Sequence, residues 1–114
     1  MNRMLVGAHY GLKDWLGQRL TAVVMLVYTL ILVVALIAGP APSQESWRAL
    51  MAGTGMRFLS FLVILSLCYH AWVGVRDIWM DYIQPVGIRL VMHTLTLFAL
   101  IGYAGWATQI LWRL

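Results

Sequence analysis

A histidine stands inside an apolar segment of this sequence, and acidic and phenolic side chains follow where that segment ends. The stretch CYHAWVGVRDIWMDYIQP contains His70, Asp77, Asp81 and Tyr82. A neutral imidazole can ligate a metal or form a hydrogen bond, and carboxylate and phenol groups can accept or donate protons. The stretch therefore combines a side chain suited to ligation with side chains suited to proton exchange.

On an α-helix these polar groups fall on one stripe. At roughly 100° per residue, Asp77 and Asp81 lie within about 20° of His70, and Ser66 and Gly74 lie within about 40°. Polar groups at membrane depth are costly, and they normally face a protein interior or a cofactor rather than lipid. Gly74, one turn from His70, leaves space for a flat ligand to approach the helix. The stripe predicts a functional face that runs from mid-segment to the segment end.

Residue type and depth leave two interpretations of His70 open. The ring can hydrogen-bond a neighbouring helix, or it can ligate haem iron, which requires a neutral imidazole with its second nitrogen held by an acceptor. His93, about one helical turn into a later apolar run, could be structural or could pair with His70 around one haem within this chain.

The residues at the segment end have simpler alternatives too. Asp77 and Asp81 could be solvated charges paired with Arg76 or Arg89, and Tyr82 could be an ordinary interfacial anchor. These alternatives stay open on composition alone.

The composition indicates a membrane protein. Of 114 residues, 62% are hydrophobic and 11% charged, and the mean hydropathy is +0.82, whereas soluble proteins carry about 25% charged residues. Lipid must therefore be part of the solvent of this chain. Its one cysteine, Cys68, permits no disulfide within the chain. The net charge of +4 is scattered rather than clustered, so nucleic acid is not an expected partner.

Three apolar runs without a charged residue divide the chain, at residues 20–38, 58–75 and 90–112. A membrane crossing takes about 20 residues, and only a helix satisfies its own backbone polar groups in lipid. The sequence thus predicts an all-α membrane protein with three transmembrane helices in a single domain, as part of a larger helical bundle. The expected divisions are an interfacial segment (1–19), three helices (20–38, 58–79, 90–112), an extracytoplasmic loop (39–57) and a cytoplasmic connector (80–89).

The distribution of basic residues predicts the orientation. One side has five (Arg3, Lys13, Arg19, Arg76, Arg89) and the other has three (Arg48, Arg57, Arg113), which favours a cytoplasmic N-terminus. The expected location is a bacterial inner membrane, in preference to a mitochondrial inner membrane. The first apolar run is longer than the apolar core of a signal peptide, about 7–15 residues, so we expect it to remain attached.

The motif around the histidine resembles a known family. The run His70-Ala71-Trp72-Val73-Gly74, followed by Asp81-Tyr82, Pro85 and Arg89-Leu90, resembles the hydrophobic membrane anchors of succinate dehydrogenase (complex II), in particular the small D-type subunits. Upstream, Gly11, Asp14, Trp15 and Arg19-Leu20-Thr21-Ala22 are similar to the start of the first helix in that family. The resemblance covers about residues 11–92, and the specific part is H-A-W-x-G with D-Y eleven and twelve residues after the histidine.

The resemblance implies roles for individual residues. His70 would be one axial ligand of a b-type haem, and therefore the ligand of its iron. Tyr82 would donate a hydrogen bond to a ubiquinone carbonyl oxygen, and Asp81 would support the ubiquinone pocket. Arg19 would lie near the haem propionates, and Lys13 stands where some relatives carry a histidine.

The resemblance also implies partners. A second anchor subunit (cytochrome b, the C subunit) would supply the other haem ligand, and flavoprotein and iron–sulfur subunits would dock for electron transfer from succinate to quinone. This chain has no dinucleotide-binding glycine motif and no cysteine cluster, so it would not itself oxidise succinate. A fumarate reductase anchor and a stand-alone transmembrane haem cytochrome are the alternatives. A small transporter is disfavoured, because no apolar run contains an acidic residue.

Overall fold

The computed structural model describes the backbone of residues 2–114 and the side chains of residues 11–114. Four helices follow one another: α1 (Asn2–Ala38), α2 (Gln44–Ala52), α3 (Thr54–Tyr82) and α4 (Val86–Trp112). The described residues form no strand, so the all-α class expected from the sequence is confirmed.

Three of the helices are long and apolar enough to cross a membrane. The spans are Gly11–Ala38, Thr54–Tyr82 and Val86–Trp112, of 28, 29 and 27 residues. At about 1.5 Å per residue each span is about 40 Å long, which exceeds the hydrocarbon core of about 30 Å. The ends of each helix therefore reach the headgroup region, and the chain is a multi-pass membrane protein.

The helices extend past the apolar runs that indicated them. α1 is continuous from Asn2, so the lead-in before the first run belongs to the same helix from residue 2 onward. α3 begins four residues before the expected 58 and ends three after the expected 79, and α4 begins at 86 instead of 90. Hydrophobicity marks the lipid-embedded part only, whereas backbone hydrogen bonding continues until a residue such as Pro85 interrupts it.

The first connector contains a helix that its composition did not indicate. α2 begins after Ser43, whose Oγ accepts from the Ser46 backbone N–H at 3.0 Å, while the Ser43 backbone N–H donates to Ser46 Oγ at 2.9 Å. This reciprocal pair is a capping box with serine in place of the usual glutamate. The negative charge of Glu45 in the first turn also interacts favourably with the positive end of the helix dipole.

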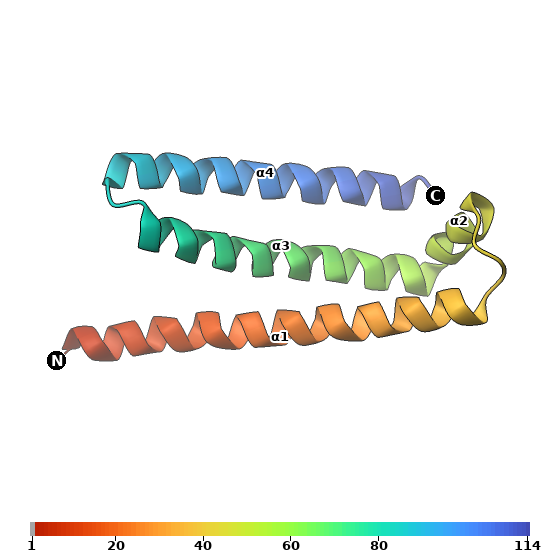
Figure 1. The fold of residues 1–114 in the computed structure, drawn as a ribbon, viewed down its shortest axis with the longest axis horizontal. Coiled ribbons are helices and arrows are strands. Elements are labelled where there is room, and N and C mark those ends of the chain that lie inside the picture. The colour runs from red at the N-terminus through yellow and green to blue at the C-terminus, as the bar shows by residue number, and fades with distance from the viewer. Residues whose placement is uncertain (1) are drawn as a thin grey trace.

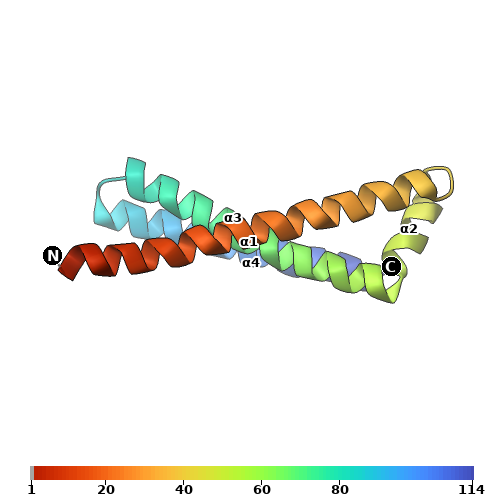
Figure 2. The same ribbon diagram turned by 90° about the horizontal axis from the view of Figure 1, so that it is seen from below.

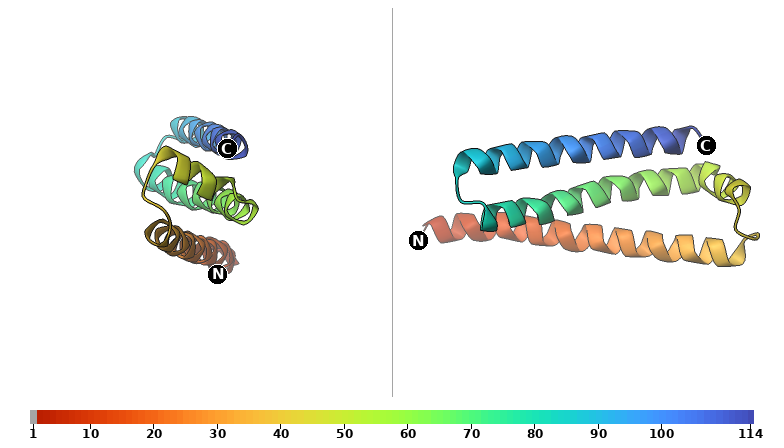
Figure 3. Two further views of the ribbon diagram at one scale, coloured as in Figure 1. Left: turned by 90° about the vertical axis from the view of Figure 1, so that its right-hand side faces the viewer. Right: turned by 45° about the horizontal axis from the view of Figure 1, so that its top comes forward.

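The three long helices lie in one row, with α3 between α1 and α4 (Figure 1). The end-on view in Figure 3 shows the same row, and Figure 2 shows that α1 crosses the other two obliquely. One end of the row holds the N-terminus and the α3–α4 turn, and we call it the turn end. The opposite end, which we call the α2 end, holds α2 and the C-terminus.

Such a row buries little of its own surface. Among the described side chains, the buried apolar ones are Met51, Val73 and Leu111, and most leucines, isoleucines and valines of the long helices are exposed. Lipid or further helices can cover them, because lipid tails are as apolar as these side chains.

Polar contacts and close approaches join the helices instead. Among the described side chains, three polar pairs cross from α1 to α3: Asp14 with Arg76, Thr21 with His70, and Tyr28 with Ser60. Between α3 and α4, Trp79 Nε1 donates to Thr96 Oγ1 at 2.9 Å. Because the helices are antiparallel, residues early in α1 meet residues late in α3.

Gly17 is a point of close approach between α1 and α3. A Cβ atom added at Gly17 would lie 2.7 Å from Tyr69 Cε1 and 2.9 Å from Tyr69 Cζ. We expect Gly17→Ala to displace the Tyr69 ring, at a cost of about 1–3 kcal/mol. This cost should exceed the gain of up to about 1 kcal/mol from the better helix propensity of alanine, so the free energy of unfolding should fall. Thermal unfolding of the full chain in detergent micelles measures this loss.

Gly102→Ala is the matched control, because a Cβ atom there meets nothing within 4 Å. Its unfolding midpoint should be unchanged or slightly higher, since alanine is the better helix former. Equal midpoints for the two variants would contradict the close packing at Gly17.

Candidate functional site

His70 lies near the middle of α3, and its ring is directed toward α1. The residue is half-buried. It lies twelve positions before Tyr82 at the helix end, which corresponds to about 18 Å along the axis. Its Nδ1 lies 3.1 Å from Thr21 Oγ1. An imidazole at membrane depth thus has a hydrogen-bond partner on a neighbouring helix, as the cost of burying polar groups requires.

Thr21 is held in place by its own helix. Its Oγ1 lies 2.7 Å from the Gly17 carbonyl oxygen and 3.2 Å from the Gln18 carbonyl oxygen. Threonine hydroxyls in helices commonly bond to the carbonyl one turn earlier. The oxygen that meets His70 therefore has a defined position.

A polar cleft of about 420 Å³ opens between α1 and α3 one turn closer to the turn end. A Cβ atom added at Gly74 would lie 3.9 Å from Gln18 Nε2, so the missing side chain leaves the wall of α3 open near this cleft. The Gln18 Oε1 atom is buried without a hydrogen-bond partner among the described residues. The cleft is lined by Gly11, Asp14, Trp15, Gln18, Arg19, Val73 and Asp77.

Charged groups surround this cleft. Arg76 Nη2 donates to Asp14 Oδ2 and thereby links α3 to α1. The same nitrogen lies 3.5 Å from Asp77 Oδ1. Arg19 is exposed, and its guanidinium carbon stands 5.1 Å from the centroid of the Trp15 ring. The Arg19 cation has no carboxylate partner among the described residues, so its charge remains available to an anion.

Asp81 and Tyr82 lie at the turn end of α3 and are both exposed, with 78% of Tyr82 accessible. The alternative in which Asp81 pairs with Arg89 is not found among the described side chains, since Arg89 Nε instead donates to the Ile83 carbonyl at 3.0 Å. Asp77 does pair with Arg76, as the other alternative expected. The Asp81 carboxylate and the Tyr82 phenol therefore extend outward from the chain.

His93 lies on the other side of α3. Its ring packs edge-on against Trp72, with centroids 5.8 Å apart at an interplanar angle of 73°. Trp72 is about 160° around α3 from His70, so His70 and His93 do not approach one another. This geometry does not favour a haem bridged by two histidines of this one chain.

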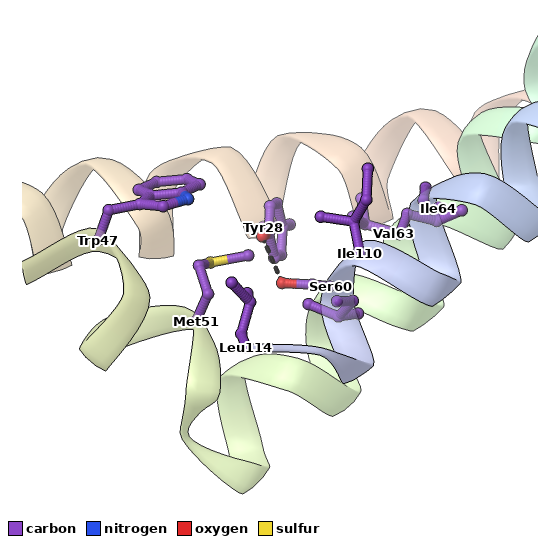
Figure 4. Close-up of a pocket in the computed structure, with 10 residues that line it drawn as sticks. Tyr28, Trp47, Met51, Ser60, Val63, Ile64, Ile110 and Leu114 are labelled. Atoms are coloured by element: carbon purple, nitrogen blue, oxygen red, sulfur yellow. Dashed lines mark hydrogen bonds between the residues drawn. The ribbon is translucent and has the colours of Figure 1, made fainter. Parts of the chain in front are cut away.

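A second cavity, of about 300 Å³, lies at the α2 end and is apolar (Figure 4). Its main polar feature is the Tyr28 hydroxyl, 2.6 Å from Ser60 Oγ. Ser60 is ten residues from His70, about 15 Å along the helix, so the cavity is separate from the polar cleft. It is lined by Tyr28, Trp47, Met51, Ser60, Val63, Ile64, Ala107, Ile110, Leu111 and Leu114.

Comparison with known proteins agrees with this layout. Residues 2–106 match the family of the succinate dehydrogenase/fumarate reductase transmembrane subunit. The chain belongs to this family. It is also similar to the succinate dehydrogenase hydrophobic membrane anchor subunit of Coxiella burnetii, with 36% identity over 102 residues that cover 90% of this chain and 89% of that protein. The resemblance noted in the sequence is thereby confirmed, and the chain is a membrane anchor subunit.

The sequence did not indicate three features of this anchor subunit. They are the Thr21 partner of His70, the Asp14–Arg76 pair, and the amide oxygen of Gln18, which has no partner among the described residues. Asp14 and Thr21 belong to the family-like start of the first helix, but nothing in that pattern indicates what they contact. These contacts could have been predicted only from the register of α1 against α3, which depends on tertiary packing.

The Asp14–Arg76 pair should contribute measurably to the contact between α1 and α3. Their side chains are 36% and 25% exposed, so a double-mutant cycle with Asp14→Asn and Arg76→Gln should give a coupling of about 0.5–1 kcal/mol. Denaturant unfolding of the full chain in detergent micelles measures the four free energies.

The matched cycle uses Asp77→Asn with Arg76→Gln. That pair is longer, at 3.5 Å, and Asp77 is 59% exposed, so its coupling should be smaller. If the Asp14 cycle were additive within error, the ion pair would not stabilise the contact between the two helices.

Proposed function

We propose that this membrane anchor subunit serves a succinate:ubiquinone oxidoreductase by supplying, through His70, one axial ligand of a b-type haem. We further propose that Tyr82 and Asp81 form part of the ubiquinone site. The observation that carries the proposal is the position of His70, mid-way along an apolar helix, with Nδ1 beside Thr21 Oγ1 and a polar cleft one turn away.

The residues around His70 fit a haem. The iron of a haem needs a neutral imidazole in an apolar region, and the propionates of the haem need cationic or donor groups at its polar edge. Arg19 and Gln18 line the cleft on α1, and Gly74 keeps the neighbouring surface of α3 free of a side chain. Arg19 would then hold a propionate by a charge-assisted hydrogen bond. When bound, the haem supplies a one-electron redox centre to the site.

The second axial ligand would come from the companion anchor subunit. His93 packs against Trp72 on the opposite side of α3 from His70, which does not favour it as the second ligand. The exposed apolar surfaces of the row support this arrangement, because a second helical subunit would cover part of them.

Tyr82 and Asp81 suit a quinone at the membrane boundary. Reduction of ubiquinone to ubiquinol takes two electrons and two protons, so its site must accept an apolar tail and admit water. A tyrosine at a helix end offers an apolar ring and a polar hydroxyl, and Tyr82 is largely exposed there. Its O–H would donate to a quinone carbonyl, while the Asp81 carboxylate, without a cationic partner among the described side chains, would hold or pass a proton.

The same assignment orients the chain. The turn end carries Lys13, Arg19, Arg76 and Arg89, so we propose that it lies on the cytoplasmic side of a bacterial inner membrane, together with the N-terminus. The iron–sulfur and flavoprotein subunits would dock at this end, close to Tyr82, and deliver the electrons of succinate. The family includes fumarate reductases, but the relative from Coxiella burnetii is named for succinate oxidation.

Replacing His70 tests the haem ligand. We expect His70→Ala to reduce or abolish the haem bands in the reduced-minus-oxidised spectrum of the purified complex, because an axial nitrogen is lost. His93→Ala is the matched control on α4 and should retain the spectrum. The reverse pattern would overturn the ligand assignment.

Replacing the phenol of Tyr82 tests the quinone contact. Tyr82→Phe removes one hydrogen bond, worth about 1 kcal/mol or more, so ubiquinone reduction should slow by about fivefold to tenfold. Succinate oxidation with an artificial soluble acceptor should be unchanged, since that reaction bypasses the quinone site.

Tyr103→Phe, at an exposed tyrosine of α4 away from the turn end, is the control and should affect neither rate. Equal losses in both assays for Tyr82→Phe would indicate a role in subunit assembly.

A further inference from the structure

We propose that Thr21 is a positioning residue that fixes the tautomer of His70, so that Nδ1 carries the proton and Nε2 faces the haem iron. This inference rests on the proposed haem ligation. On this inference, α1 supplies the residue that orients the iron-binding histidine of α3.

The hydrogen bonds of Thr21 determine the direction of its contact with His70. A threonine hydroxyl has one hydrogen to donate, and backbone carbonyls can only accept. Thr21 Oγ1 lies 2.7 Å from the Gly17 carbonyl oxygen, which is its shortest contact, and 3.1 Å from His70 Nδ1. With its hydrogen directed to Gly17, Oγ1 presents a lone pair to the ring.

The imidazole must then donate from Nδ1. If Nδ1 were unprotonated, two lone pairs would face one another at membrane depth, unless Thr21 turned its hydrogen away from the Gly17 carbonyl and gave up that short bond. A neutral imidazole has a single N–H. Protonation at Nδ1 therefore leaves the Nε2 lone pair free, which is the form that ligates a metal while the other nitrogen donates to an acceptor.

The packing of α1 against α3 holds this contact in register. On either side of it along α1, Asp14 pairs with Arg76 and Tyr28 bonds to Ser60. Gly17, one turn before Thr21, accommodates the Tyr69 ring, which neighbours His70 in sequence. The threonine oxygen is thus fixed both by its own helix and by the helix that carries the histidine.

Thr21→Val tests the inference, because valine keeps the shape of threonine and lacks its hydroxyl. Thr21→Ser keeps the hydroxyl. Thr29→Val is the matched control on α1. Thr29 Oγ1 makes the same backbone bond, to Met25 at 2.8 Å, is exposed, and has no hydrogen bond to a histidine among the described residues. Each variant is made in the assembled complex, and haem affinity and midpoint potential are measured.

We expect Thr21→Val to weaken haem binding by about 10- to 100-fold, the usual effect of losing a hydrogen-bond partner of a metal-bound histidine. The midpoint potential should become more positive, because an imidazole without its acceptor donates less electron density to ferric iron. Thr21→Ser and Thr29→Val should match the unchanged protein. Unchanged haem affinity and potential in Thr21→Val would overturn the inference.

A second measurement does not depend on haem or on a substitution at Thr21. Nitrogen-15 NMR of histidine-labelled full chain in detergent micelles reports which ring nitrogen of His70 carries the proton, with His70→Ala identifying the signal. We expect protonated Nδ1, and a protonated Nε2 would overturn the proposal.

The two levels of the argument fail separately. If His70→Ala retained the haem spectrum, the proposed haem ligation would be wrong. If His70→Ala lost the spectrum while Thr21→Val matched the unchanged protein, the ligand would stand and only the role of Thr21 would fall.

Discussion

The polar contacts between α1 and α3 are the constraint on which the rest of this structure depends. In lipid, apolar surfaces do not drive helices together as they do in water, so packing and hydrogen bonds must hold them. Asp14 with Arg76, Thr21 with His70, and Tyr28 with Ser60 are spread along the length of the contact. A slip of either helix by one turn would break all of them at once, and their combination therefore defines the register.

That register determines where the chemistry can take place. It places the imidazole of His70 beside a hydroxyl of α1 and opens the polar cleft toward the turn end. Arg19 and the unpaired amide oxygen of Gln18 meet the cleft because they lie one turn or less before Thr21 on the same helix. A bound group can thus lie beside His70 in the groove between α1 and α3, with its anionic edge near Arg19 and the aqueous boundary at the turn end.

The surface of the chain indicates that it is one part of a larger assembly. The row of three helices (Figure 3) exposes most of its described apolar side chains, and Asp81 and Tyr82 at the end of α3 are also exposed. This is consistent with a subunit whose sites are completed by its partners, and membership of the succinate dehydrogenase/fumarate reductase transmembrane family implies that such partners exist.

Sequence patterns alone indicated the class of this protein, its three long helices and the stripe containing His70, because hydrophobic runs and helical periodicity are local properties of a chain. They also carried the family motif from His70 to Tyr82. They did not reveal α2, whose start depends on two serines that cap one another.

Tertiary structure alone decided which histidine faces α1, which residue meets its Nδ1, and that Asp14 pairs with Arg76. The physical reason is that each of these contacts joins residues on two different helices: Thr21 and His70 are 49 positions apart, and Asp14 and Arg76 are 62. The rotation and register of packed helices fix such contacts, and no local pattern in the sequence records them.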